Sequence, residues 1–151
     1  MSASPEAQLD GFLDKFTPEI AARARATLVK MRERLPGVLE LVYDNYQALA
    51  IGFGPSERAS EAVFSIAVMP DRVSLIFIYG VGLPDPEGRL GGGGNQVRHV
   101  RLPTPQTLDE PAVQALMADA LARAKVPLDT DQPHRLIIKS ISAKQRSRRP
   151  A

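Results

Sequence analysis

The spacing of apolar residues changes after about the first 35 residues of this chain, and that change is the strongest constraint on its fold. Up to about residue 35, apolar side chains recur every three or four positions, as on one face of an amphipathic helix. From about residue 46 they alternate within short segments between turn-forming residues, as in β-strands. Helical and strand segments do not alternate regularly, which argues against a doubly wound parallel sheet and favours an α+β fold.

Two helix-start signals stand in the first part of the chain. Ser4-Pro5-Glu6 and Thr17-Pro18-Glu19 each combine a hydroxyl cap, a proline in the first turn and an acid at the positive end of the helix. They predict an amphipathic helical hairpin that ends at Pro36-Gly37. Asp109-Glu110-Pro111 predicts the start of a third helix.

Five segments are rich in β-branched and aromatic residues, and they predict strands. These segments are Tyr46–Phe53, Ala62–Met69, Val73–Tyr79, Val97–Leu102 and Leu136–Ile141. Pro70-Asp71 predicts a tight turn that joins the second and third as an antiparallel hairpin. We therefore expect a two-layer α+β fold, in which the helical hairpin and the third helix pack on a mainly antiparallel sheet of about five strands.

Composition excludes several kinds of chemistry. The chain has no cysteine, which rules out disulfides, thiolate zinc sites, iron–sulfur clusters and cysteine nucleophiles. Its two histidines are too few for a multi-histidine metal site, and there is no Gly-x-Ser-x-Gly elbow of a serine hydrolase. We expect no cofactor.

The length of 151 residues fits one domain, which we place at residues 1–142, followed by a basic tail at 143–151 that we expect to be flexible. The tail holds four basic residues and no acid: Lys144, Arg146, Arg148 and Arg149. Without them the chain has 15 basic and 17 acidic side chains, so the basicity belongs to the tail. No aromatic residue is interleaved with these charges, and we expect a solvated terminus rather than a nucleic-acid-binding arm.

The longest apolar stretch, around Val73 to Leu83, is interrupted and too short to span a membrane. The first residues have neither the cationic region nor the apolar core of a secretion signal. We expect a cytoplasmic protein without a membrane partner, and its association into a homodimer stays open.

The most unusual local feature is a run of four glycines: Gly91, Gly92, Gly93 and Gly94. Such a backbone can turn sharply and point several amides at one anion, with Arg89, Arg98 and Arg101 adding charge. The residues after the glycines match neither a dinucleotide-binding fingerprint nor a P-loop. We expect residues 80–96 to form an ordered loop across one end of the sheet. The alternative is a flexible loop whose glycines make room for close backbone packing.

Arg98-His99-Val100-Arg101 forms the strand after this loop. His99 and Arg101 share one face, whereas Arg98 points with apolar neighbours. An unpaired buried guanidinium is costly, so we expect a carboxylate partner for Arg98, either Asp85 or Asp44. His99 is a candidate acid, base or single metal ligand; the alternative is a local hydrogen bond on the sheet.

Tyr43-Asp44-Asn45-Tyr46 is the third candidate segment. Two phenols, a carboxylate and an amide within four residues can line a polar pocket beside the sheet. The same residue types are also typical of a turn that leads into a strand.

Several segments together resemble the domain-of-unknown-function family 1801, the YdhG-like family. They are Tyr43-Asp44-Asn45-Tyr46, Gly52-Phe53-Gly54-Pro55, Gly80 with Leu83-Pro84-Asp85-Pro86, Leu90 to Gly93, Arg98 to Leu102 and Lys139-Ser140-Ile141. The resemblance implies a compact α+β domain with a single antiparallel sheet packed by helices, and it implies no particular activity. Some relatives carry an iron-chaperone label described as frataxin-like, but no acidic ridge is evident in this sequence.

We conclude from the sequence that binding is a better interpretation than catalysis. The expected ligand is a small anionic molecule or a protein partner, held by the glycine-rich loop and the strand after it. The candidate ligand-binding residues are Tyr43, Asp44, Tyr46, Asp85, Gly91, Gly92, Gly93, Arg98, His99 and Arg101. The alternatives are a frataxin-like iron chaperone and an enzyme that uses His99.

Overall fold

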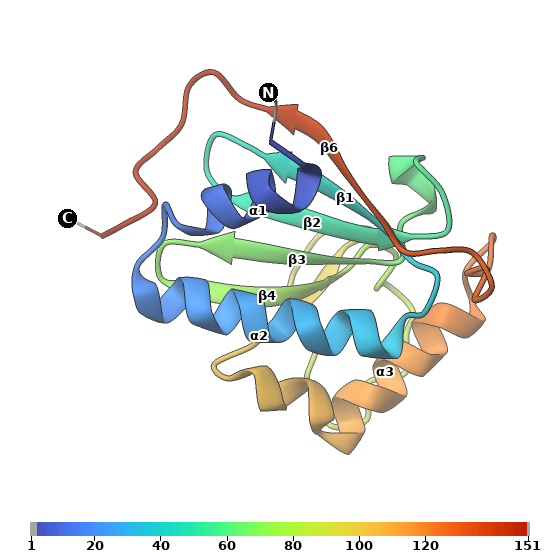
Figure 1. Ribbon diagram of the computed structural model, residues 1–151. Helices are drawn as coiled ribbons and strands as arrows, with labels where there is room; N and C mark the ends of the chain where they lie inside the picture. The colour runs from blue at the N-terminus through green and yellow to red at the C-terminus, as the bar shows by residue number, and fades with distance from the viewer. Residues whose placement is uncertain (1–2, 151) are drawn as a thin grey trace.

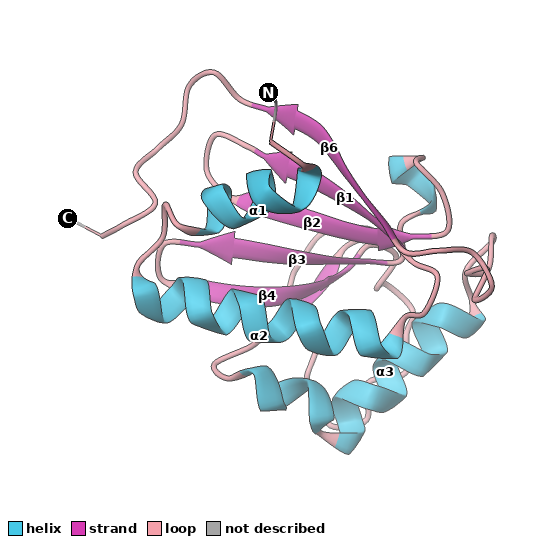
Figure 2. Ribbon diagram, viewed as in Figure 1, coloured by secondary structure: helices cyan, strands magenta, loops and turns pink. Residues whose placement is uncertain are grey.

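The computed structural model describes residues 3–150, which form three α-helices, two short 3-10 helices and six strands (Figure 2). In chain order these are α1 Pro5–Leu13, α2 Pro18–Arg34, β1 Leu39–Asp44, β2 Leu49–Gly54, η1 Ala59–Glu61, β3 Phe64–Met69, β4 Arg72–Phe77, β5 Arg98–Arg101, η2 Pro105–Asp109, α3 Pro111–Ala122 and β6 Arg135–Ile141. The predicted α+β class is confirmed.

The strands form one sheet in the order β5-β4-β3-β2-β1-β6 (Figure 1). Every neighbouring pair is antiparallel except β1 and β6, which are parallel. The sheet has one strand more than the sequence predicts, and the additional strand is β1. Its covered face carries Glu40 and Asp44, which break the apolar alternation on which the prediction relied.

Both predicted helix caps are confirmed. The hydroxyl of Ser4 accepts a hydrogen bond from the amide of Ala7 at the start of α1, and Thr17 accepts one from Ile20 at the start of α2. Helices α1 and α2 lie across one face of the sheet, and α3 lies beside α2 (Figure 1). No helix within residues 3–150 is long and apolar enough to cross a membrane.

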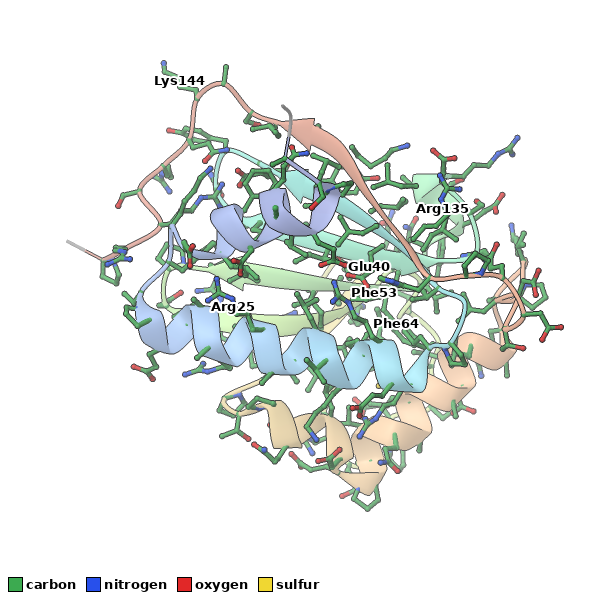
Figure 3. All side chains as sticks on the ribbon, viewed as in Figure 1. Arg25, Glu40, Phe53, Phe64, Arg135 and Lys144 are labelled. Carbon is green, nitrogen blue, oxygen red and sulfur yellow. The ribbon has the colours of Figure 1, made fainter. Side chains whose placement is uncertain are left out.

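The main core lies between the sheet and these helices. Phe53 and Phe64 are fully buried there, as Figure 3 shows beneath α2, and Phe64 meets Phe77 edge-on at a centroid distance of 5.6 Å. On the other face of the central strands, Ser65 of β3 and Ser74 and Ile76 of β4 alternate with the core residues.

Two carboxylates are also buried on the covered face of β1. Glu40 is 0% exposed and accepts hydrogen bonds from Arg32 of α2 at 2.6 and 3.0 Å, and it contacts the imidazole of His134. Figure 3 shows Glu40 between α2 and the sheet. Asp44 is 1% exposed and pairs with Lys15 at 2.7 Å and with Arg148 at 2.9 Å. Both carboxylates are therefore neutralised by residues from other segments.

Arg148 belongs to the segment that the sequence assigns to a flexible, solvated tail, yet the structure buries it. Its side chain is 2% exposed and lies 5.5 Å from the centre of the Phe16 ring. It also donates to the carbonyl of Asn45. Burial lowers the pKa of the Arg148 guanidinium, and the charge of Asp44 opposes that effect. The interpretation of Arg148 as a solvated charge is therefore wrong, whereas Lys144 is exposed beyond β6 (Figure 3).

We predict that Asp44→Asn lowers the free energy of unfolding by about 3 kcal/mol, because it leaves two cations next to an uncharged group in a buried site. Chemical denaturation followed by circular dichroism measures this change. Asp71→Asn is the matched control, because the carboxylate of Asp71 is 66% exposed beside Arg72. We expect the control to change stability by less than about 0.5 kcal/mol. Equal effects of the two substitutions would contradict the prediction.

Candidate functional site

The loop between β4 and β5 is held by close backbone contacts and contains no helix. A Cβ on Gly80 would lie 2.6 Å from the Cβ of Arg98, so only glycine allows the loop to leave β4 this close to β5. The carboxylate of Asp85 accepts hydrogen bonds from the amides of Arg89 at 2.8 Å and Leu90 at 3.0 Å. Asp85 therefore shapes the turn that leads to the glycines.

Gly91 pairs with His99 across the free edge of β5. The amide of each residue donates to the carbonyl of the other, at 2.8 and 3.0 Å. The imidazole of His99 covers Gly91 so closely that a Cβ there would lie 2.8 Å from Nε2. This glycine therefore makes room for a side chain, which is the packing role that the sequence left open as an alternative.

The next three glycines have a different environment. Gly92, Gly93 and Gly94 are exposed, and within residues 3–150 their amides donate no hydrogen bond. Gly92 has a φ of +118°, which favours glycine, whereas a Cβ on Gly93 or Gly94 would meet nothing within 4 Å. This part of the run therefore leaves backbone donors available to a ligand.

A hollow of about 350 Å³ lies where the loop, β5 and the start of α3 meet, and we call it the β5 hollow. Its lining includes Arg89, Gly91, His99, Arg101, Thr107 and Glu110. Arg89 forms an ion pair with Glu110 at 2.5 Å, and this hydrogen bond raises the pKa of the Arg89 guanidinium. Arg101 is exposed and forms no ion pair within the described residues. The hollow therefore carries one cation whose charge no carboxylate offsets.

Arg98 does not have the carboxylate partner that the sequence predicts. Its guanidinium donates to the carbonyl oxygens of Gly94 at 2.6 Å and Val97 at 2.8 Å. Asp85 is used by loop amides, and Asp44 lies at the other side of the sheet. The prediction failed because β5 is an edge strand: a long side chain at its first residue reaches the loop instead of the core.

The structure separates the predicted site residues into two groups. Strands β4, β3 and β2 lie between β5, which carries His99 and Arg101, and β1, which carries Tyr43 and Asp44. The ring of Tyr46 is 46% exposed, with Arg146 6.0 Å from its centre. The hydroxyl of Tyr43 is buried and has no hydrogen-bond partner within residues 3–150. Tyr43, Asp44 and Tyr46 are therefore not part of the β5 hollow.

Sequence reasoning did not identify Thr107 or Glu110 as part of the site. Both belong to the segment that leads into α3, and their place beside Arg89 in the hollow depends on how η2 and α3 fold back against the loop. The only signal in the sequence was the complementary charge of Arg89 and Glu110, and several other acids offered the same complementarity. No group of three or more histidine or acidic side chains that could hold a metal ion occurs within residues 3–150.

Comparisons with protein-family models, with curated proteins and with solved structures found no match. The geometry of the β5 hollow is therefore the basis for a functional proposal.

We predict that Gly91→Ala displaces the His99 ring and lowers the free energy of unfolding by about 1 to 2 kcal/mol, because the new Cβ overlaps the imidazole. In a His99→Ala background, which removes the ring, Gly91→Ala should lower the free energy of unfolding by a smaller amount. Gly93→Ala is the matched control, since a Cβ there meets nothing within 4 Å. Denaturant unfolding of the four variants measures the coupling, and additive effects of Gly91→Ala and His99→Ala would contradict the contact.

We further predict that Tyr43→Phe is neutral or stabilising near pH 7, because it removes a buried hydroxyl that lacks a partner. Burial raises the pKa of Tyr43 above its ordinary value of 10.0, so folding favours the neutral phenol. This contribution to stability is present below about pH 10 and is lost as the pH rises through the raised pKa. Wild type should therefore lose more stability than Tyr43→Phe between about pH 9 and pH 11 in denaturant titrations. Tyr46→Phe, at an exposed ring, is the control, and parallel curves for wild type and Tyr43→Phe would refute the burial argument.

Proposed function

We propose that this protein is a non-catalytic binding protein for a small anionic molecule, and that the β5 hollow is its binding site. The observation that carries the proposal is the exposed guanidinium of Arg101, which no acid within residues 3–150 offsets, beside an imidazole and free glycine amides. The proposal keeps Gly91, Gly92, Gly93, His99 and Arg101 from the sequence interpretation and adds Arg89.

The charges of the hollow favour an anion. Arg89 shares its charge with Glu110, whereas Arg101 is not neutralised and His99 adds a second donor when it is protonated. Arg98 satisfies its hydrogen bonds with two carbonyl oxygens, so its positive charge also remains uncompensated next to the glycine run. Strand β5 therefore carries three cationic or protonatable side chains, Arg98, His99 and Arg101.

The available donors suit a phosphate or carboxylate group. A guanidinium can donate two parallel hydrogen bonds to either group, and successive backbone amides can form a concave anion site. Gly92, Gly93 and Gly94 supply such amides within a few residues of Gly91, which lines the hollow. A phosphate-bearing metabolite in the cytoplasm is the ligand class that this arrangement fits best.

The resemblance to family 1801 is part of the same proposal. The α+β class that it implies agrees with the fold described above, and the quoted segments Gly80 and Arg98 to Leu102 include residues that build the hollow and its loop. The family has no established activity that would argue for catalysis instead.

The test is a titration with inorganic pyrophosphate, followed by amide resonances in heteronuclear NMR. We expect shifts at Gly92 to Asn95, His99 and Arg101 that weaken as salt is added. Arg101→Ala should lower the affinity roughly tenfold to hundredfold, because it removes a charge-assisted hydrogen bond. Arg135→Ala is the matched control, since Arg135 starts the strand at the opposite edge of the sheet and is 58% exposed.

Three outcomes would contradict the proposal. Shifts confined to the tail around Lys144 and Arg146 would indicate nonspecific attraction of a polyanion. An absence of shifts for pyrophosphate, sulfate and citrate would assign the glycines to packing alone. Hydrolysis of pyrophosphate by wild type, lost in His99→Ala, would favour the enzyme alternative.

A further inference from the structure

A second, deeper hollow lies at the other end of α3. It has a volume of about 450 Å³ and is enclosed by η1, the ends of β3 and β4, and the residues that follow α3. Its lining shares no residue with the β5 hollow. We call it the α3 hollow, and its size is that of a site for a small organic ligand.

The interior of the α3 hollow is apolar. Its floor includes Phe77 and Val63, which are 0% and 7% exposed. Ala120 lies near the end of α3 and Ala124 follows the helix, and both line the hollow with short side chains. A ligand with an apolar body would cover the exposed surfaces of Tyr79 and Val126 and be stabilised by the hydrophobic effect.

One wall of the hollow is an aromatic ring held in place. Tyr79 is 53% exposed, and its hydroxyl donates to the carbonyl oxygen of Ser60. Val126 continues the apolar lining and is 41% exposed. Large apolar side chains this exposed around a concave surface are typical of a binding site rather than of a solvated one.

The charge at the mouth of the hollow is positive. Arg123 donates to the carbonyl oxygen of Gly82 at 2.8 Å, which is a neutral partner, and Lys125 forms no ion pair within residues 3–150. Glu61 is the only acid in the lining, and its carboxylate accepts a hydrogen bond from Ser56 at 2.7 Å and lies 3.9 Å from Arg58. Two uncompensated cations therefore flank an apolar hollow.

We propose that the α3 hollow binds a small amphipathic carboxylate. Its apolar or aromatic body would lie on Tyr79, Ala120 and Val126, and its carboxylate would be held by Arg123 and Lys125. This ligand class differs from that of the β5 hollow, which offers an imidazole and glycine amides as additional polar donors. The two hollows share no lining residue, so either binding proposal can be disproved without affecting the other.

The test compares 2-naphthoate with its neutral analogue 2-naphthamide in NMR titrations of the full chain. We expect both to shift amides of Tyr79 and of residues 123–126, with naphthoate binding about fivefold to tenfold more tightly because of its charge. Lys125→Met keeps the length of the side chain and should reduce this preference. Lys144→Met, an exposed tail residue, is the matched control and should leave the preference unchanged.

A second substitution tests the apolar part of the hollow. Ala124→Leu should fill it and weaken both ligands at least tenfold, while the partly exposed position just after α3 can accommodate the larger side chain. The thermal midpoint and the pyrophosphate response of the β5 hollow report whether this variant is folded. If Ala124→Leu is unfolded, Ala120→Val replaces it.

Three results would overturn the proposal. Equal affinities for naphthoate and naphthamide would remove the role of the cations at the mouth. Shifts at Gly92 to Asn95 instead of residues 123–126 would assign the carboxylate to the β5 hollow. Unchanged binding in a folded, filled variant would show that the ligands do not enter the α3 hollow.

Discussion

Glu40 and Asp44 lie buried on the covered face of β1, and much of the fold depends on neutralising them. A carboxylate that leaves water loses several kcal/mol of solvation unless cations and hydrogen bonds replace it. Arg32 and His134 contact Glu40, whereas Lys15 and Arg148 contact Asp44. These four partners come from α2, from the residue before β6, from the connection between α1 and α2, and from the C-terminal segment. The two carboxylates thus tie four distant segments to one strand.

This arrangement explains where β6 lies. It pairs in parallel with β1 at the edge of an otherwise antiparallel sheet, more than 90 residues after β1 in the chain. Pairing at such separation has a large loop-closure entropy to overcome. His134 contacts Glu40 directly before β6 begins, and Arg148 contacts Asp44 after β6 ends. We infer that these two contacts fix the position of β6 more than they add to net stability, because buried polar pairs often only offset their own desolvation.

The same residues show how far the sequence can predict the structure. The helix starts at Ser4 and Thr17 were predictable because a cap and its amide lie three residues apart. Strand β1 was not, because its buried alternate positions hold Glu40 and Asp44, and a period-two apolar pattern does not include buried charges. The burial of Arg148 was not predictable either, since its partner Asp44 is 104 residues away.

The candidate site was predictable to a similar degree. The glycine run and the charges of β5 mark the β5 hollow locally in the sequence. Glu110 becomes part of the hollow only through the packing of η2 and α3. Arg98 donates to two backbone carbonyl oxygens close to it in the chain instead of to the expected carboxylate. Residue types close together in the sequence thus identified where the site lies. The partners of its charged side chains could not be predicted, because they depend on how the loop, η2 and α3 pack.

The two sides of the sheet use their cations differently. Near β1 and β6, buried carboxylates neutralise Arg32, Lys15 and Arg148. Near β5 and α3, Arg98 and Arg123 donate to neutral carbonyl oxygens. Such hydrogen bonds do not neutralise the positive charge of the guanidinium groups. Uncompensated positive charge therefore remains at Arg98 beside the β5 hollow and at Arg123 in the α3 hollow. An anion that approaches either hollow meets charges that the fold itself does not use, which is why we place binding there and the structural ion pairs at β1.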